Sequence, residues 1–114
     1  MKGLIQCPCC NQGDIDPRLK FIINSIEREL GEELYSESCY RCPKHNAKKG
    51  GKENSAHIKG LAVDIRCENS NFRWKLVNKL CSLGIKRFGI SFKGKYIHID
   101  IDNTLPQMVI WGYE

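Results

Sequence analysis

The chain has 114 residues, 41% of them hydrophobic and 27% charged, and carries a net charge of +5. This composition is that of one globular domain, residues 1–114, and excludes a disordered or membrane-spanning chain, since no apolar run reaches the roughly 20 residues of a spanning helix. The positive charge suits an anionic partner, but no stripe of aromatic and basic residues indicates nucleic-acid binding.

The N-terminal segment is rich in cysteine, and its apolar stretch is too short for a secretory signal, so we expect synthesis in the cytoplasm. Two CxxC pairs, Cys7 with Cys10 and Cys39 with Cys42, have the spacing of tetrahedral thiolate zinc sites, and Cys9 lies inside the first pair. These cysteines could hold a second, structural metal at Cys7, Cys10, Cys39 and Cys42, form disulfides, or remain reduced and buried. The chain has seven cysteines, so at least one stays unpaired within it.

The first predicted helix lies in DPRLKFIINSIEREL, residues 16–30. Asp16 is suited to the N-cap, Pro17 to the first helical position, and Gly31 to the end of the helix. One face carries apolar residues at helical spacing, namely Leu19, Ile22, Ile23, Ile26 and Leu30. A short strand is predicted within residues 33–41, and residues 42–57, rich in lysine, asparagine and glycine, are expected to form an exposed loop that belongs to a functional site.

The segment GLAVDIRC, residues 60–67, alternates as a strand does, with Val63 on one side and Asp64 on the other. A second helix is predicted over residues 71–83, capped by Ser70 or Asn71 and ended by Gly84. Two of the remaining cysteines are expected in the core, Cys67 at the end of the strand and Cys81 in the helix.

Residues 85–102 are predicted to form two strands joined by a hairpin turn at Lys93, Gly94 and Lys95. His98 and Asp100 share one face of the second strand, together with Tyr96 and Asp102, and residues 107–113 can add a last strand or an apolar cover. The order of elements indicates an α+β fold, with two helices packed on a mainly antiparallel sheet.

Three residues are candidate metal ligands: His57, Asp64 and His98. Two histidines and one carboxylate would leave a tetrahedral zinc ion with an open position for water, as in catalytic sites. A histidine in an apolar strand is more often a satisfied structural residue, but an aspartate between Val63 and Ile65 requires a cation or several hydrogen-bond donors.

The sequence resembles a known family in these segments. SCYRCPKHNAKKGGKENSAHIKGLAVDI followed by YIHIDI is similar to the zinc peptidases of the D-alanyl-D-alanine carboxypeptidase and L-alanyl-D-glutamate endopeptidase group, especially short phage-type members. The family pattern SxHxxGxAxD is filled by Ser55, His57, Gly60, Ala62 and Asp64. The upstream part of the pattern is matched by Arg41, Pro43, Asn46, Gly50 and Gly51, and the distal HxD by His98 and Asp100.

The resemblance implies that His57, Asp64 and His98 bind one catalytic Zn²⁺ and that a metal-activated water hydrolyses stem peptides of peptidoglycan. Arg41 would hold the substrate carboxylate or polarise the scissile carbonyl, and Ser55 would bind substrate or orient a ligand. The expected species is a monomeric phage or prophage lysin that reaches the bacterial cell wall through a membrane opened by a holin.

The general base departs from the family pattern, because Lys95 and Tyr96 occupy the positions before His98 where related enzymes often carry an acid or a histidine. Asp100 is the candidate, either as the base or as a carboxylate that receives the second N–H of His98. Tyr96 could instead donate to the developing oxyanion. Two other functions remain open: a catalytically weak or inactive zinc-binding module of the same fold, as in hedgehog-type domains, and a zinc-ribbon-like interaction protein built on the CxxC pairs.

Overall fold

The computed structural model describes residues 1–114, and its first long helix has the predicted ends. Helix α1 (Pro17–Leu30) begins after Asp16, whose side chain accepts a hydrogen bond from the Arg18 N–H at 2.8 Å. It ends at Gly31, which adopts the left-handed conformation and donates its N–H to the Glu27 carbonyl. Helix α3 (Ser70–Ser82) has Asn69 as its N-cap, which accepts the Phe72 N–H, so the cap lies one residue before Ser70 and two before Asn71.

Six strands form one mixed sheet in the order β1-β2-β3-β5-β4-β6. Its members are β1 (Lys2–Gly3), β2 (Tyr35–Ser38), β3 (Ala62–Arg66), β4 (Arg87–Ser91), β5 (Tyr96–Asp100) and β6 (Val109–Gly112). The pairs β2–β3, β3–β5 and β4–β5 are antiparallel, whereas β1–β2 and β4–β6 are parallel. The predicted α+β class and mainly antiparallel sheet are therefore confirmed, as is the last strand near the C-terminus.

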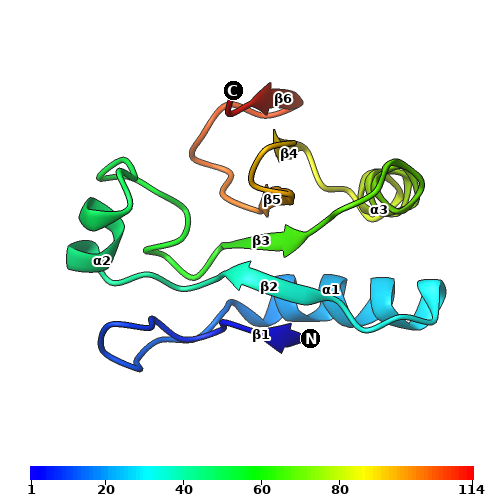
Figure 1. Cartoon of the computed structure of the whole chain (residues 1–114). Helices are drawn as coiled ribbons and strands as arrows, with labels where there is room; N and C mark the ends of the chain where they lie inside the picture. Colours follow the sequence, from blue (N-terminus) through cyan, green and yellow to red (C-terminus); the bar gives the residue numbers. More distant parts are fainter.

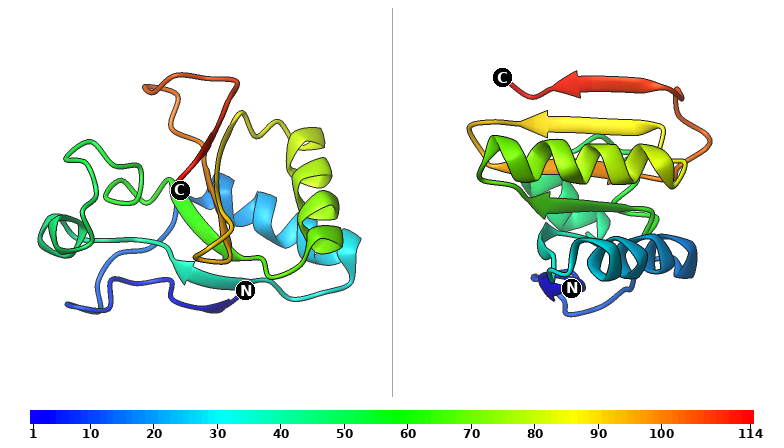
Figure 2. Two further views of the ribbon diagram at one scale, coloured as in Figure 1. Left: turned by 45° about the horizontal axis from the view of Figure 1, so that its top comes forward. Right: turned by 90° about the vertical axis from the view of Figure 1, so that its right-hand side faces the viewer.

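The two long helices cover the same face of the sheet, as the right-hand view of Figure 2 shows. The apolar side of α1 packs there against every second residue of β3 and β5. The core includes Leu19, Ile23, Val63, Ile65, Leu76, Leu80, Ile97 and Ile99. The opposite face carries polar side chains that are also buried, among them Asp64, His98 and Asp100. Burial on both faces explains why β3 and β5 can place charged groups out of contact with bulk water.

One predicted loop contains a helix. The segment expected to be an exposed loop forms α2 (Pro43–Lys48), which lies away from α1 and α3 at the far side of the sheet (Figure 1). Cys42 caps this helix by accepting the His45 N–H on its sulfur, and Pro43 has the backbone angle of the first helical turn. A six-residue helix with no apolar stripe has no periodicity to reveal it, so the prediction of a structureless loop was wrong here.

The predicted burial of the two late cysteines is half correct. Cys67 is 1% exposed and belongs to the core. Cys81 is exposed, because it follows Leu80 on α3 and successive helical residues point about 100° apart. With Leu80 directed into the core, Cys81 is turned toward solvent.

Candidate metal centre and cleft

Three polar side chains from separate elements meet on the sheet face opposite the long helices. His57 comes from the connection between α2 and β3, Asp64 from β3 and His98 from β5. Asp64 and His98 are directly opposite partners in the antiparallel register, so their side chains project from the same point of the sheet. Gly60, with φ of +72°, turns the connection back to the sheet, and a Cβ there would lie 2.6 Å from the Asp14 carbonyl oxygen.

The ligand atoms of these residues converge. His98 Nδ1 lies 2.9 Å from Asp64 Oδ1, and His57 Nε2 lies 3.2 Å from both His98 Nδ1 and Asp64 Oδ1. All three side chains are buried. Nitrogen and oxygen ligands about 2.0–2.1 Å from a zinc ion span edges close to these separations in a tetrahedron. The site can therefore hold a metal ion, as the residue types and the family resemblance led us to expect.

The tautomer of each imidazole is set by a contact on its other side. His57 Nδ1 lies 2.6 Å from the Cys39 carbonyl oxygen, which can only accept, so Nδ1 carries the proton and Nε2 keeps its lone pair. His98 Nε2 donates in the same way to Asp100 Oδ2 at 2.8 Å, which leaves the lone pair on Nδ1. With both imidazoles neutral, two lone pairs and a carboxylate oxygen face one another across about 3 Å, and a proton or a metal cation among them relieves their repulsion.

The electrostatics of the site favour positive charge at this point. Burial opposes ionisation of Asp64, but its contacts with His57 and His98 hold the pKa of the carboxyl well below its ordinary value. Burial would also lower the pKa of His98, yet Asp100 and Asp64 raise it above the ordinary value. A buried carboxylate facing two imidazoles is a ready-made partner for a divalent cation.

Asp100 is fixed from two directions. Its Oδ2 accepts from His98, while its Oδ1 accepts from Arg87 Nε at 2.7 Å and from the Asp102 N–H at 3.2 Å. Arg87 also donates to the Pro106 carbonyl at 2.6 Å. Both carboxylate oxygens of Asp100 are therefore engaged, and the residue lies behind His98 as seen from the other two ligands.

The side chain of Asp102 makes no hydrogen bond with Asp100, His98 or Arg87; only its backbone N–H does, by donating to Asp100. The Asp102 carboxylate accepts from Lys59 Nζ at 2.7 Å and from the Thr104 hydroxyl at 2.6 Å. Burial works against ionisation, but these partners lower the pKa of Asp102 below 3.8. It contributes to the structure beside the site.

The three candidate ligands line a cleft of about 960 Å³. Arg41, Ser55 and Tyr96, which the sequence singled out for substrate binding, all line it. The Arg41 Nε is buried and has no hydrogen-bond partner, while Ser55 Oγ accepts the His57 N–H at 3.3 Å. Burial raises the pKa of Tyr96, whose ring lies beside that of Tyr113 at 5.6 Å between centroids.

The sequence reasoning missed Arg87 as a residue of the cleft, and it gave residues 107–113 as a last strand or an apolar cover. Arg87 could have been noticed as a charged residue in a predicted strand, but sequence spacing does not identify Asp100 as its partner. Trp111, on β6, and Tyr113, just after it, both line the cleft. The Trp111 ring centroid lies 5.5 Å from that of His98 and 4.9 Å from the Arg87 guanidinium carbon. Gly89 makes room for them, because a Cβ there would lie 2.6 Å from Trp111 Nε1 and 2.7 Å from the Tyr113 hydroxyl.

A second cluster that could hold a metal lies near the N-terminus, and its membership differs from the predicted one. It contains Cys7, Cys9, Cys10 and Cys42, with sulfur atoms all within 4.8 Å of one another. Cys39 does not belong to it, since its side chain is buried and its sulfur contacts the Ala62 carbonyl. The second CxxC pair is therefore divided, and Cys9 takes the place given to Cys39.

Residues 2–100 match the family model described as Peptidase M15. No curated protein and no solved structure matches the chain. The match ends with Asp100, so it includes all three candidate ligands but not β6 with Trp111. None of the helices is long and apolar enough to cross a membrane.

Proposed function

The chain belongs to the peptidase M15 family, and on that premise we propose that it is a zinc-dependent peptidase that hydrolyses the stem peptides of peptidoglycan. The observation that carries the proposal is the convergence of His57 Nε2, Asp64 Oδ1 and His98 Nδ1, with both imidazole tautomers fixed. Three protein ligands of this kind leave one position open, which is the composition of catalytic rather than structural zinc sites.

A zinc ion held by His57, Asp64 and His98 would supply a Lewis acid that activates water and polarises a peptide carbonyl. Arg41 would bind the substrate, either at its carboxylate or at the scissile carbonyl. Its buried Nε without a partner supports this role, because a guanidinium binds a carboxylate through two parallel hydrogen bonds and an unpaired buried donor is costly. Tyr96 and Ser55 would complete the polar lining around the substrate.

Asp100 would act as a positioning residue through His98, which is one of the two roles that the sequence left open. Its carboxylate accepts the Nε2–H of His98 and is itself held by Arg87. Such a partner fixes the orientation of a ligand histidine and raises its basicity. A proton carrier would need an oxygen directed at the substrate, and both oxygens of Asp100 have other partners.

One observation favours a second function, a zinc-binding wall module with little or no activity. The acidic residues that line the cleft are Glu37, Asp64 and Asp100, and each is paired, Glu37 with Arg66 at 2.5 Å. None of them is a free carboxylate beside the three ligands. A net charge of +5 would favour retention on the anionic cell wall in either case.

The deciding experiment is digestion of purified peptidoglycan by the zinc-loaded protein, with the products identified by mass spectrometry. We expect release of D-alanine or cleavage between L-alanine and D-glutamate, and His57→Ala protein serves as the control that lacks a ligand. If the zinc-loaded protein sediments with insoluble peptidoglycan but cuts no bond, the wall-module function replaces the peptidase. Absence of both cutting and sedimentation would remove the peptidoglycan substrate altogether.

A further inference from the structure

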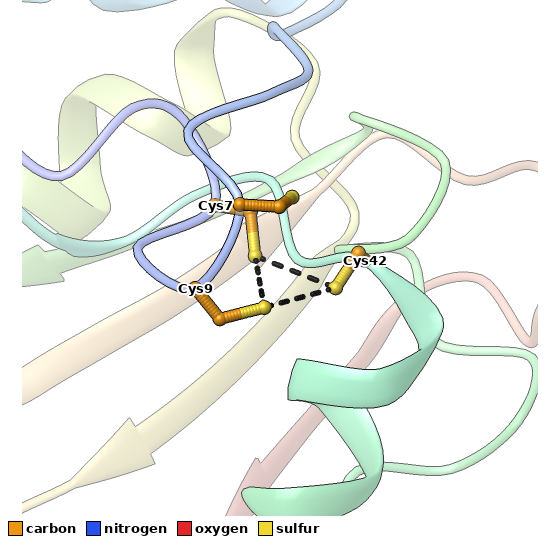
Figure 3. Close-up of side chains that lie close together, drawn as sticks. Cys7, Cys9 and Cys42 are labelled. Atoms are coloured by element: carbon orange, nitrogen blue, oxygen red, sulfur yellow. Dashed lines mark hydrogen bonds between the residues drawn. The ribbon is translucent and has the colours of Figure 1, made fainter.

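Four cysteine sulfurs lie together outside the cleft ligands. Cys9 Sγ lies 3.3 Å from Cys42 Sγ and 3.5 Å from Cys7 Sγ, and the Cys7 and Cys42 sulfurs are 3.6 Å apart (Figure 3). Cys10 Sγ lies within 4.8 Å of all three. The three closest sulfurs form a nearly equilateral triangle, which pairwise disulfide bonding does not explain.

The backbone at Cys7–Cys10 is shaped to direct several thiols to one point. A tight turn is closed by hydrogen bonds from the Asn11 N–H to the Cys7 carbonyl at 2.7 Å and from the Cys7 N–H to the Gln12 carbonyl at 3.0 Å. Asn11 has a φ of 55°, in the left-handed region that asparagine tolerates better than most residues. This turn, residues 7–12, is called the cysteine knuckle below.

We propose that Cys7, Cys9, Cys10 and Cys42 bind a structural zinc ion. With zinc–sulfur bonds of about 2.3 Å, the sulfurs of a tetrahedral site are roughly 3.8 Å apart, close to the separations within the triangle. Four thiolates fill every position of a tetrahedral ion, so the site has no place for substrate or water and serves the fold. Thiolate ligands select zinc or iron among the common divalent metals, and zinc is the one that needs no redox partner.

The ion would fasten the cysteine knuckle to the start of α2. Cys42 caps α2 and directly follows Arg41, while Pro8, inside the knuckle, lines the same cleft as Arg41. Next to the knuckle, the Tyr40 N–H donates to the Ile5 carbonyl at 3.0 Å, so the segment already lies against the chain that leads into α2. A metal bridge across 35 residues of sequence would therefore stabilise one wall of the cleft.

Metal content of the full chain, purified under reducing conditions, tests the proposal without any measurement of activity. We expect two zinc ions per wild-type chain and one in Cys9→Ser, whose altered side chain is exposed and leaves the core intact. Cys81→Ser is the matched control, because Cys81 is also exposed but lies alone on α3, and it should retain two. His57→Ala should retain the thiolate-bound ion, so loss of the cleft metal and loss of the cysteine metal are separate results.

Cobalt substitution identifies the ligands directly. Wild-type and His57→Ala proteins loaded with Co²⁺ should show thiolate-to-cobalt charge-transfer absorption, and Cys9→Ser should lose most of it. Equal zinc content in Cys9→Ser and wild type, or iron in place of zinc, would overturn the proposal.

A measurement on the unaltered chain covers the case in which the variant does not fold. Cys9 and Cys10 are exposed, so iodoacetamide can reach both, and it should react with them faster as free thiols than when they are bound to zinc. We expect slow alkylation of both in the zinc-loaded protein, and rapid alkylation after zinc is removed with a chelator. Rapid alkylation before chelation, or a disulfide among the four cysteines in protein kept reduced, would contradict the zinc site.

Discussion

Replacing Asp100 with asparagine separates positioning of a metal ligand from transfer of a proton. Asp100 accepts the His98 Nε2–H at 2.8 Å and the Arg87 Nε–H at 2.7 Å, one on each oxygen. Asparagine keeps the shape of the side chain but removes the charge and converts one acceptor into a donor. Only one of the two partners can then face the amide oxygen, and in either orientation His98 loses the negative charge that raises its basicity.

The expected effect is a weaker zinc site. Loss of the hydrogen-bond partner behind a ligand histidine typically costs 10–100-fold in metal affinity, or about 1.4–2.7 kcal/mol. We therefore expect the zinc Kd of Asp100→Asn, measured by competition with a chromophoric chelator, to rise by about 10–100-fold. Asp102→Asn is the matched control, since Asp102 is an equally buried carboxylate two residues away that binds Lys59 and not His98, and its zinc Kd should be unchanged.

Hydrolysis of a stem peptide at saturating zinc completes the test. With the metal restored, Asp100→Asn should recover most of its kcat if Asp100 acts through His98. An unchanged zinc Kd together with a kcat that stays low at saturating zinc would refute the positioning role, and would assign Asp100 to proton transfer.

Leu80→Ala should lower the free energy of unfolding by about 2–5 kcal/mol in urea titration, because Leu80 is fully buried, while Trp74→Ala, at a side chain 67% exposed, should change it by less than about 0.5 kcal/mol. The stabilisation that the Lys59–Asp102 ion pair contributes should be present near neutral pH and decrease as the pH falls below 3.8, because Asp102 has a lowered pKa in the folded chain and must bind a proton in that range. Urea titrations of wild type and Lys59→Met across this range measure the difference in their free energies of unfolding. A difference that stays constant with pH would contradict the ion pair. Arg41→Lys should keep its zinc but lose about 10–100-fold in kcat/KM on stem peptides, since one charge-assisted hydrogen bond contributes about 1.5–3 kcal/mol, and unimpaired kcat/KM would argue against a two-point contact.

The parts of the fold that the sequence predicted well are those where one physical signal dominates. The first long helix has an apolar face, a capping aspartate and a terminal glycine, and all three signals agree with the observed α1. The alternation of β3 and β5 likewise placed Asp64 and His98 away from the apolar side of each strand, and the observed register sets them opposite one another. Such local patterns depend on the period of the backbone, which the chain carries in every short segment.

The predictions that failed concern relations between segments. CxxC spacing cannot say which cysteines share a metal, because Cys39 and Cys42 are divided by the turn that leads from β2 into α2, and only Cys42 faces the knuckle. The pairing of Arg87 with Asp100 depends on which strands become neighbours, and sequence spacing does not encode that. The three candidate metal ligands could be named in advance because their combination matches a motif of the family that the sequence resembles.

Asp64 and His98 are opposite one another in the β3–β5 register, although 34 residues separate them along the chain. A slip of one residue between these strands would turn His98 toward the helices and leave Asp64 alone. The three-ligand centre therefore cannot exist in any partly folded chain in which β3 and β5 have not yet paired correctly. Binding of a metal ion by these three candidate ligands would then have to follow the pairing of β3 with β5, and its rate during refolding would report when the two central strands reach their native alignment.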